Sequence, residues 1–166
     1  MIYLDNAATS RFKPKCALDA LLFDVSHSAN SGRGSHDEAV DKSIRIQKCR
    51  DYLLSVLGAR EGYSLVFTKN CTEALNLAIF GLVNGGEKVV TSTNEHNSVL
   101  RPLYKLKSEG KISLDVVKAD RSGHIRLEDV EKYAKYADIM VFGGACNVTG
   151  VVCDIDEIAN ICKKYN

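Results

Sequence analysis

The segment from Thr68 to Glu73 has the residue types of an anion-binding turn. It follows a short apolar run that ends at Phe67 and precedes a helical pattern, so it predicts a strand, a polar turn and a helix amino terminus. Free backbone N–H groups and the helix dipole at such a terminus favour a negative charge, and the Thr72 hydroxyl can donate to it. Simple capping of the helix by Asn70 or Thr72 is the alternative. The turn lacks a Gly-Lys-Ser/Thr sequence, which argues against a nucleoside triphosphate as the anion.

His96 lies in a second polar loop, just after another short β-branched run. An imidazole at the end of a strand can stack on a planar cofactor, relay a proton or bind a metal ion. A metal would need further ligands, and we expect the neighbouring Glu95 to point the other way. A capping or solvated histidine is the alternative to these three functions.

A third loop, from Gly143 to Gly150, is rich in small residues. Small residues let a ligand approach the backbone closely, and Asn147 offers both a hydrogen-bond donor and an acceptor. The alternative is an ordinary glycine-rich turn in which Asn147 takes a left-handed conformation. Each loop is a weak signal alone, so the fold that positions the three loops decides whether they form one site.

Short β-branched runs alternate with amphipathic stretches, which is typical of βαβ units on a parallel sheet. Ligands of open α/β sheets bind beyond the carboxyl ends of the strands, so we expect the three loops to share one edge. Pro102 is expected in or near the first turn of its helix, where its missing N–H costs nothing. The predicted strands are residues 64–67, 89–91, 114–117 and 139–142; the predicted helices are 15–25, 37–57, about 72 to before Gly85, a stretch after Glu95 that ends at Glu109, 127–136 and 155–165.

The composition is that of an ordinary globular chain. Its 166 residues are 45% hydrophobic and 26% charged, which fits one domain or a piece of a larger one. The 22 basic and 21 acidic side chains give a net charge of +1. Electrostatic binding to nucleic acid or to a membrane surface needs a basic excess, so we expect neither partner.

The sequence predicts a cytoplasmic location. It has no run of about 18 apolar residues that would span a membrane, and its first residues lack the basic and apolar regions of a signal peptide. Thiols are reduced in that compartment, and the six cysteines form no C-x-x-C pair, so neither a zinc site nor a redox site is predicted. They are Cys16, Cys49, Cys71, Cys146, Cys153 and Cys162.

Five segments, in this order, resemble the class V aminotransferase family, and within it the cysteine desulfurase-like enzymes that use pyridoxal 5′-phosphate (PLP). The resemblance extends over nearly the whole chain. The segments are Tyr3–Thr9 (YLDNAAT), Asn30–His36 (NSGRGSH), Phe67–Asn76 (FTKNCTEALN), Glu95–Pro102 (EHNSVLRP) and Asn147–Gly150 (NVTG).

The resemblance implies an α/β fold that is part of the large domain of a fold type I PLP-dependent transferase, with a mostly parallel sheet flanked by helices. Residues 1–14 would be an amino-terminal segment that packs on the small domain of the full family fold, and residues 15–166 an incomplete PLP-binding large domain. In the family, strands from later in the sequence separate the strand at 64–67 from the other three. We therefore expect a gap in the sheet or a different pairing, and an isolated chain that is marginally stable, oligomeric or dependent on a partner fragment.

The resemblance also implies the residues that bind the cofactor. Cys71 and Thr72 match the pair that holds the PLP phosphate. The family usually has Ala, Gly or Thr at the position of Cys71, so its backbone N–H matters more than its thiol. His96 matches the histidine stacked on the pyridine ring and is the catalytic residue implied in this chain. Asn147 matches the asparagine near the ring hydroxyl and the substrate carboxylate.

The implied substrate is a small amino acid, L-cysteine or a relative of it, whose sulfur passes to an acceptor protein. Asn6 and Ala7 would line the substrate side together with Asn147, and the loop from Arg33 to His36 would approach the site across a homodimer interface. Selenocysteine lyase and a general class V aminotransferase are related possibilities, so the reaction could belong to a transferase or a lyase.

Four functional residues of the family have no match in the sequence. The Schiff-base lysine follows a histidine in the family motif, and the chain has no His-Lys dipeptide. The aspartate that pairs with the ring nitrogen, the nucleophilic cysteine and the arginine that grips the substrate carboxylate are unmatched as well. We therefore expect the chain alone to be inactive. The alternatives are a catalytically inactive module for anion binding or protein interaction, one half of a split enzyme, and an unrelated α/β phosphate-binding domain.

Overall fold

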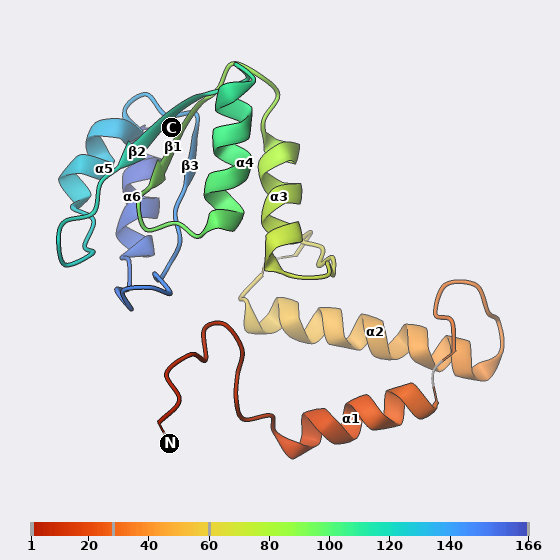
Figure 1. Ribbon diagram of the computed structural model, residues 1–166. Helices are drawn as coiled ribbons and strands as arrows, with labels where there is room; N and C mark the ends of the chain where they lie inside the picture. Colours follow the sequence, from red (N-terminus) through yellow and green to blue (C-terminus); the bar gives the residue numbers. More distant parts are fainter. Residues whose placement is uncertain (1, 28, 60, 166) are drawn as a thin grey trace. The chain divides into compact units, whose positions relative to one another are not determined.

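The chain divides into two compact units, Met1–Phe67 and Thr68–Asn166 (Figure 1). The computed structural model describes residues 2–27, 29–59 and 61–165. The predicted boundary at residue 14 falls inside the first unit and stays a prediction. No helix in the described ranges combines the length and the apolar character that a membrane crossing requires.

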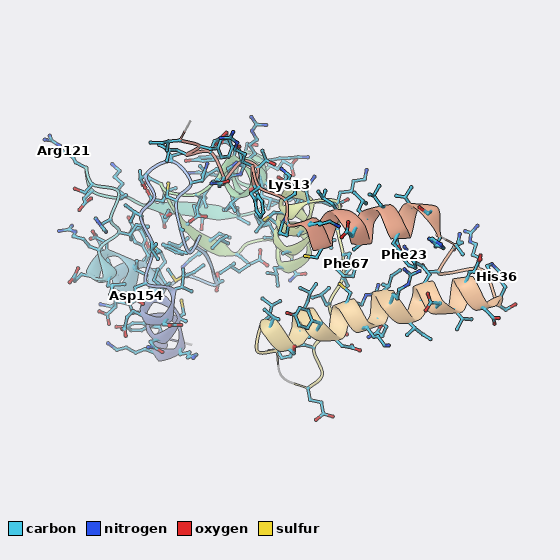
Figure 2. The ribbon with its side chains drawn as sticks, turned by 90° about the horizontal axis from the view of Figure 1, so that it is seen from below. Lys13, Phe23, His36, Phe67, Arg121 and Asp154 are labelled. Carbon is cyan, nitrogen blue, oxygen red and sulfur yellow. The ribbon has the colours of Figure 1, made fainter. Side chains whose placement is uncertain are left out.

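The first unit contains helices α1 (Lys15–Ser26) and α2 (Asp37–Val56), each within one residue of its predicted end. Asp24 links them, because its carboxylate pairs with Lys42 and with Nη1 of Arg45 at 3.3 Å. The hydrogen bond from Lys42 lowers the pKa of Asp24. The Arg45 guanidinium lies 5.4 Å from the ring centre of Phe23, which is on the side of α1 that faces α2 (Figure 2).

The predicted strand at residues 64–67 is wrong: this segment has no strand assignment and lies in the first unit. Val66 and Phe67 are exposed. A β-strand exists only where its backbone groups pair with a neighbouring strand, and none of the three strands in the described residues pairs with this segment. A short, mostly apolar run is therefore not sufficient to make a strand in this chain.

The second unit is a parallel three-stranded sheet in the order β2-β1-β3, with two helices on each face (Figure 1). This architecture confirms the predicted α/β fold class. Val90 of the central strand is in register with Asp115 on one side and Met140 on the other. The strands are β1 (Lys88–Ser92), β2 (Ser113–Val117) and β3 (Ile139–Val141); the helices are α3 (Cys71–Leu82), α4 (Asn97–Ser108), α5 (Leu127–Ala134) and α6 (Ile155–Tyr165).

Successive side chains of β1 pack in hydrophobic cores on opposite sides of the sheet. Val89 packs in the cluster that includes Leu103 of α4 and Ile79 of α3, whereas Val90 packs with Val130 of α5 and Ile158 of α6. Successive side chains of a strand point to opposite faces, so one buried strand serves both helix layers. This packing holds the carboxyl ends of the strands and the helix amino termini at fixed positions along one edge.

Pro102 lies in the second turn of α4, not in or near the first as predicted, because the helix begins at Asn97. A proline inside a helix cannot donate to the carbonyl four residues earlier, which is that of Ser98. Instead, Nδ2 of Asn76 donates to this carbonyl oxygen at 3.4 Å and to that of Thr72 at 2.7 Å. Pro102 thus leaves the Ser98 carbonyl without a backbone donor. The bond from Asn76 to this carbonyl connects α4 to the first turns of α3.

Candidate functional site

The amino termini of α3 and α4 and the loop after β3 lie on the same edge of the second unit (Figure 1). Two hydrogen-bonding side chains connect these segments. Asn76 joins α3 to α4, and Glu95 accepts from the backbone N–H of Gly143 at 2.8 Å. The segments that carry Thr72, His96 and Asn147 are therefore neighbours, as expected, although no strand of the described sheet ends before Thr68.

The first turn of α3 has backbone donors that are not used. Oδ1 of Asn70 caps the helix by accepting from the N–H of Glu73 at 2.9 Å, and Oε2 of Glu73 accepts from the N–H of Lys69 at 2.6 Å. Within the described part of the chain, nothing accepts from the N–H groups of Cys71 and Thr72 or bonds the Thr72 hydroxyl. Asn70 does the capping, so Thr72 is left available to an anion.

His96 caps α4 with one ring nitrogen. Its Nδ1 accepts from the N–H of Ser98 at 3.1 Å and lies 2.8 Å from the Ser98 hydroxyl. The nitrogen that accepts carries no proton, so the neutral ring has its proton on Nε2. The capping role left open by the sequence is confirmed. It fixes the ring at the strand end, while the side chain remains exposed.

Asn147 is exposed in a tight turn after β3. The N–H of Gly150 donates to the carbonyl of Cys146 at 2.9 Å, and the N–H of Cys146 donates to that of Val151 at 2.9 Å. The alternative in which Asn147 is left-handed is wrong, because every described residue with positive φ is a glycine. Gly150 supplies that conformation at φ 74°, which leaves Asn147 free to present its amide.

Cys146 is buried beneath this turn. Hydrogen bonds from the Thr149 side chain and from the N–H groups of Thr149 and Val148 lower the pKa of its thiol, against the opposing effects of burial and of the Glu95 charge. In contrast to Cys146, Cys16, Cys49 and Cys71 are exposed.

Glu95 makes a link between two loops that the sequence did not predict. It was expected to point away from the site, and its Oε1 instead accepts from Ser92 Oγ at 2.9 Å and from Gly143 N at 2.8 Å. The sequence signal was the Ser-x-x-Glu spacing at the end of a strand. A metal ion would need further ligands. The described residues bring together no group of three or more His, Cys, Asp or Glu side chains that could hold one.

Two of the three predicted substrate-side residues, Asn6 and Ala7, lie in the first unit. Oδ1 of Asn6 accepts from the N–H of Arg11 at 3.2 Å, and Ala7 is exposed in the same turn. In the loop from Arg33 to His36, a Cβ on Gly34 would come within 2.7 Å of Ala39 Cβ, so the loop packs tightly on α2. The roles of Asn6, Ala7 and this loop toward a substrate stay predictions.

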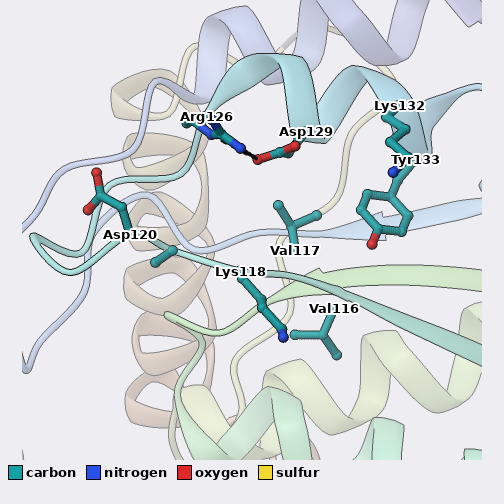
Figure 3. Close-up of a pocket in the computed structure, with 9 residues that line it drawn as sticks. Val116, Val117, Lys118, Asp120, Arg126, Asp129, Lys132 and Tyr133 are labelled. Atoms are coloured by element: carbon teal, nitrogen blue, oxygen red, sulfur yellow. Dashed lines mark hydrogen bonds and ion pairs between the residues drawn. The ribbon is translucent and has the colours of Figure 1, made fainter.

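A cavity of about 590 Å³ lies between the end of β2 and α5 and contains none of the predicted site residues (Figure 3). Its charged side chains have mixed signs: Arg126 pairs with Asp129 at 2.9 Å, and Lys118 and Asp120 lie on the strand side. Hydrogen bonds from the backbone of His124 and Ser122 lower the pKa of Asp120. These carboxylates are engaged by neighbours, so the exposed edge and not this cavity carries the candidate site.

Comparison with known proteins identifies the family that the sequence motifs resemble. The family model described as aminotransferase class-V matches residues 2–166. A probable cysteine desulfurase from Pyrococcus abyssi is 31% identical over 168 residues, which cover 99% of this chain and 41% of that protein. A probable cysteine desulfurase from Borreliella burgdorferi is 29% identical over 173 residues, covering 100% of this chain and 41% of that protein.

The fold of a solved relative agrees with these matches. The apo structure of a cysteine desulfurase from Thermococcus onnurineus superimposes with a TM-score of 0.89 at 31% identity, over 99% of this chain and 42% of that one. The chain thus spans about two fifths of the length of the relatives it matches and corresponds to their amino-terminal part. A family pattern that matches from residue 2 to residue 166, on the same α/β fold, shows that the chain belongs to the class V aminotransferase family.

Proposed function

We propose that the second unit binds the phosphate and ring of PLP in a cysteine desulfurase-like enzyme. The observation that carries the proposal is a set of donors at the start of α3 that have no acceptor among the described residues: the N–H groups of Cys71 and Thr72 and the Thr72 hydroxyl. They lie on the same edge as the exposed His96 and Asn147. A bound phosphate would satisfy these donors and interact favourably with the helix dipole.

The residues present fit the remaining parts of the cofactor. His96 has its ring orientation fixed by the bond at Nδ1, so its face and Nε2 are available to a planar ring. Asn147 projects from a turn held by Cys146 and Gly150 and can donate to a ring oxygen or a carboxylate. When bound, PLP supplies the electron sink for amino-acid chemistry, and the protein orients it and tunes its environment.

The substrate we propose is L-cysteine or a related small amino acid, acted on by the whole enzyme as a homodimer that passes sulfur to an acceptor protein. The names of the relatives support the reaction class, since several are cysteine desulfurases. Asn6 and Ala7 are proposed to face the substrate. The six free thiols are in keeping with a reducing compartment such as the cytoplasm.

The direct test is binding of pyridoxine 5′-phosphate to the purified chain by isothermal titration calorimetry. This compound has an alcohol in place of the aldehyde, so it cannot condense with surface lysines. We expect Thr72→Ala to weaken binding about fivefold, the loss of one exposed hydrogen bond. Ser108→Ala, which removes an exposed hydroxyl at the far end of α4, should leave binding unchanged.

Two results would contradict the proposal. One is equal affinity for pyridoxine and its 5′-phosphate, which would mean that the phosphate makes no contact with the protein. The other is equal binding by the Thr72→Ala and Ser108→Ala variants, which would place any phosphate site elsewhere.

A further inference from the structure

We infer that Glu95 is a positioning residue whose carboxylate holds the loop that carries His96 against the loop that carries Asn147. The inference rests on the proposed function for the identity of the ligand. Its structural basis is independent of any ligand, because it is a hydrogen-bonded link between residues 48 positions apart in the sequence.

One carboxylate oxygen forms the link. Oε1 of Glu95 accepts from Ser92 Oγ at 2.9 Å and from Gly143 N at 2.8 Å. Ser92 is completely buried at the end of β1, and its Oγ also accepts from the N–H of Asn94 at 3.2 Å. The carboxylate is therefore anchored on a rigid strand and reaches across to the neighbouring strand end.

The link continues the contact between β1 and β3 beyond the strands themselves. The ladder between these strands ends at Thr91 and Val141, where the Thr91 hydroxyl donates to the Val141 carbonyl at 2.9 Å. Gly143 lies two residues further, and Glu95 supplies an acceptor for its N–H. A Cβ on Gly143 would be 3.1 Å from Glu95 Oε2, so glycine allows the close approach.

The other residues of the His96 loop are linked in a different direction. Thr93 Oγ1 accepts from Ala119 N at 2.9 Å, and Asn94 Nδ2 donates to the Gly123 carbonyl at 2.7 Å. Both partners follow β2. Glu95 is thus the side chain of this loop that ties it to the segment after β3, on which Asn147 lies four residues beyond Gly143.

Glu87 provides a matched control at the opposite end of β1. Its carboxylate also accepts two hydrogen bonds, from the N–H groups of Asn84 and Gly85, each at 2.8 Å. These bonds stabilise a turn that precedes the strand, far from the carboxyl edge. Losing either carboxylate removes two hydrogen bonds, but only the loss at Glu95 separates the two loops.

The experiment compares the wild-type chain with Glu95→Ala, Glu95→Gln and Glu87→Ala by ¹⁵N NMR and by titration with pyridoxine 5′-phosphate. Without ligand, Glu95→Ala should accelerate hydrogen exchange of the Gly143 amide and increase backbone motion at both His96 and Asn147. With ligand, it should weaken binding about tenfold. Glu95→Gln should restore both readouts, because a Gln oxygen can accept the same two bonds.

Glu87→Ala should lower the melting temperature comparably to Glu95→Ala while leaving the Gly143 amide, the His96 and Asn147 motions and the affinity at wild-type values. Glu95→Ala with wild-type exchange at Gly143 and unchanged motion at His96 and Asn147 would overturn the inference. If Glu95→Ala loosens both loops but the wild-type chain does not bind the phosphate compound, the positioning role is supported and the proposed function fails.

Discussion

Helices α3 and α4 begin on the same edge of the sheet, but their first turns are used in opposite ways. At α3, Asn70 accepts from the N–H of Glu73, and the N–H groups of Cys71 and Thr72 have no acceptor in the part of the chain that the structure describes. At α4, the capping residue is His96 itself, whose Nδ1 takes the N–H of Ser98. A cap on the third N–H of a helix leaves the first two available to an anion, whereas a cap made by a histidine gives that ring a fixed orientation.

Proline at residue 71 is the strongest way to break this comparison. Position 71 is the first residue of α3, where proline is favoured and only the N–H is lost. The preceding Asn70 is extended at φ −167° and ψ 172°, as a residue before proline must be. We expect Cys71→Pro to weaken pyridoxine 5′-phosphate binding about tenfold without lowering the melting temperature.

Two variants serve as controls for this prediction. Cys71→Ala keeps the N–H and removes only the thiol, so it should bind as the wild type does. Asn97→Pro makes the same substitution at the first residue of α4, after the extended His96, and should also bind normally. Equal weakening by Cys71→Pro and Asn97→Pro would show that α3 has no special role.

Replacing His96 separates its two roles. His96→Ala should cost about 1 kcal/mol of unfolding free energy through loss of the cap and should also weaken ligand binding. His96→Asn should recover the stability, because an Asn oxygen caps well, but not the binding, because it has no ring. Urea denaturation and calorimetry measure the two effects. Full recovery of binding by His96→Asn would refute the stacking role.

Asn76 connects the two termini, and its removal should affect stability without removing a contact with the ligand. Asn76→Ala deletes the bonds to the carbonyls of Thr72 and Ser98. We expect a loss of about 1 kcal/mol in unfolding free energy and a faster hydrogen exchange in the first turns of both helices. Exchange that increases in α3 but not in α4 would mean that the 3.4 Å bond to Ser98 does not couple the helices.

The smallest expected effect is a pH dependence of stability. The pKa of Asp120 is lowered by hydrogen bonds from the backbone of His124 and Ser122, and that of Glu87 by those of Asn84 and Gly85. A folded-state pKa below the unfolded value gives stability that is present above the unfolded pKa and is lost as the pH falls through the folded one. The melting temperature should therefore decrease as the pH falls below about 4.

The Asp120→Asn variant sharpens this prediction. It should show a shallower decrease in melting temperature over the same acidic range, because its side chain no longer titrates. A decrease identical to that of the wild type would show that Asp120 does not contribute to the acid sensitivity.

Local patterns were sufficient for most elements of the second unit. The run from Ile155 to Tyr165 predicted α6 with its observed bounds, and Val89–Thr91 predicted the core of β1. Local sequence patterns failed where an element depends on pairing with another strand or on a side-chain cap. Residues 64–67 have strand-like composition but no strand to pair with, and the start of α4 five residues before Pro102 depends on a His96 cap that periodicity does not report.

The candidate site was likewise predictable only where local patterns or family motifs report it. The three polar loops follow from their positions after apolar runs, and the family motifs supply Cys71, Thr72, His96 and Asn147. The Ser-x-x-Glu spacing could have indicated the local bond from Ser92 to Glu95. The bond from Gly143 was not predictable, because this partner is 48 residues away and the contact exists only when β1 and β3 are adjacent. The choice between Asn70 and Thr72 as the cap likewise required side-chain geometry.

The most direct test of the account is a ¹H–¹⁵N NMR titration of the wild-type chain with pyridoxine 5′-phosphate. We expect saturable downfield shifts of the Cys71 and Thr72 amides, because each forms a hydrogen bond to the phosphate, with smaller shifts at His96 and Asn147. Saturable binding that leaves the Cys71 and Thr72 amides unmoved, or no saturable binding at all, would contradict the central claim that the start of α3 holds the cofactor phosphate.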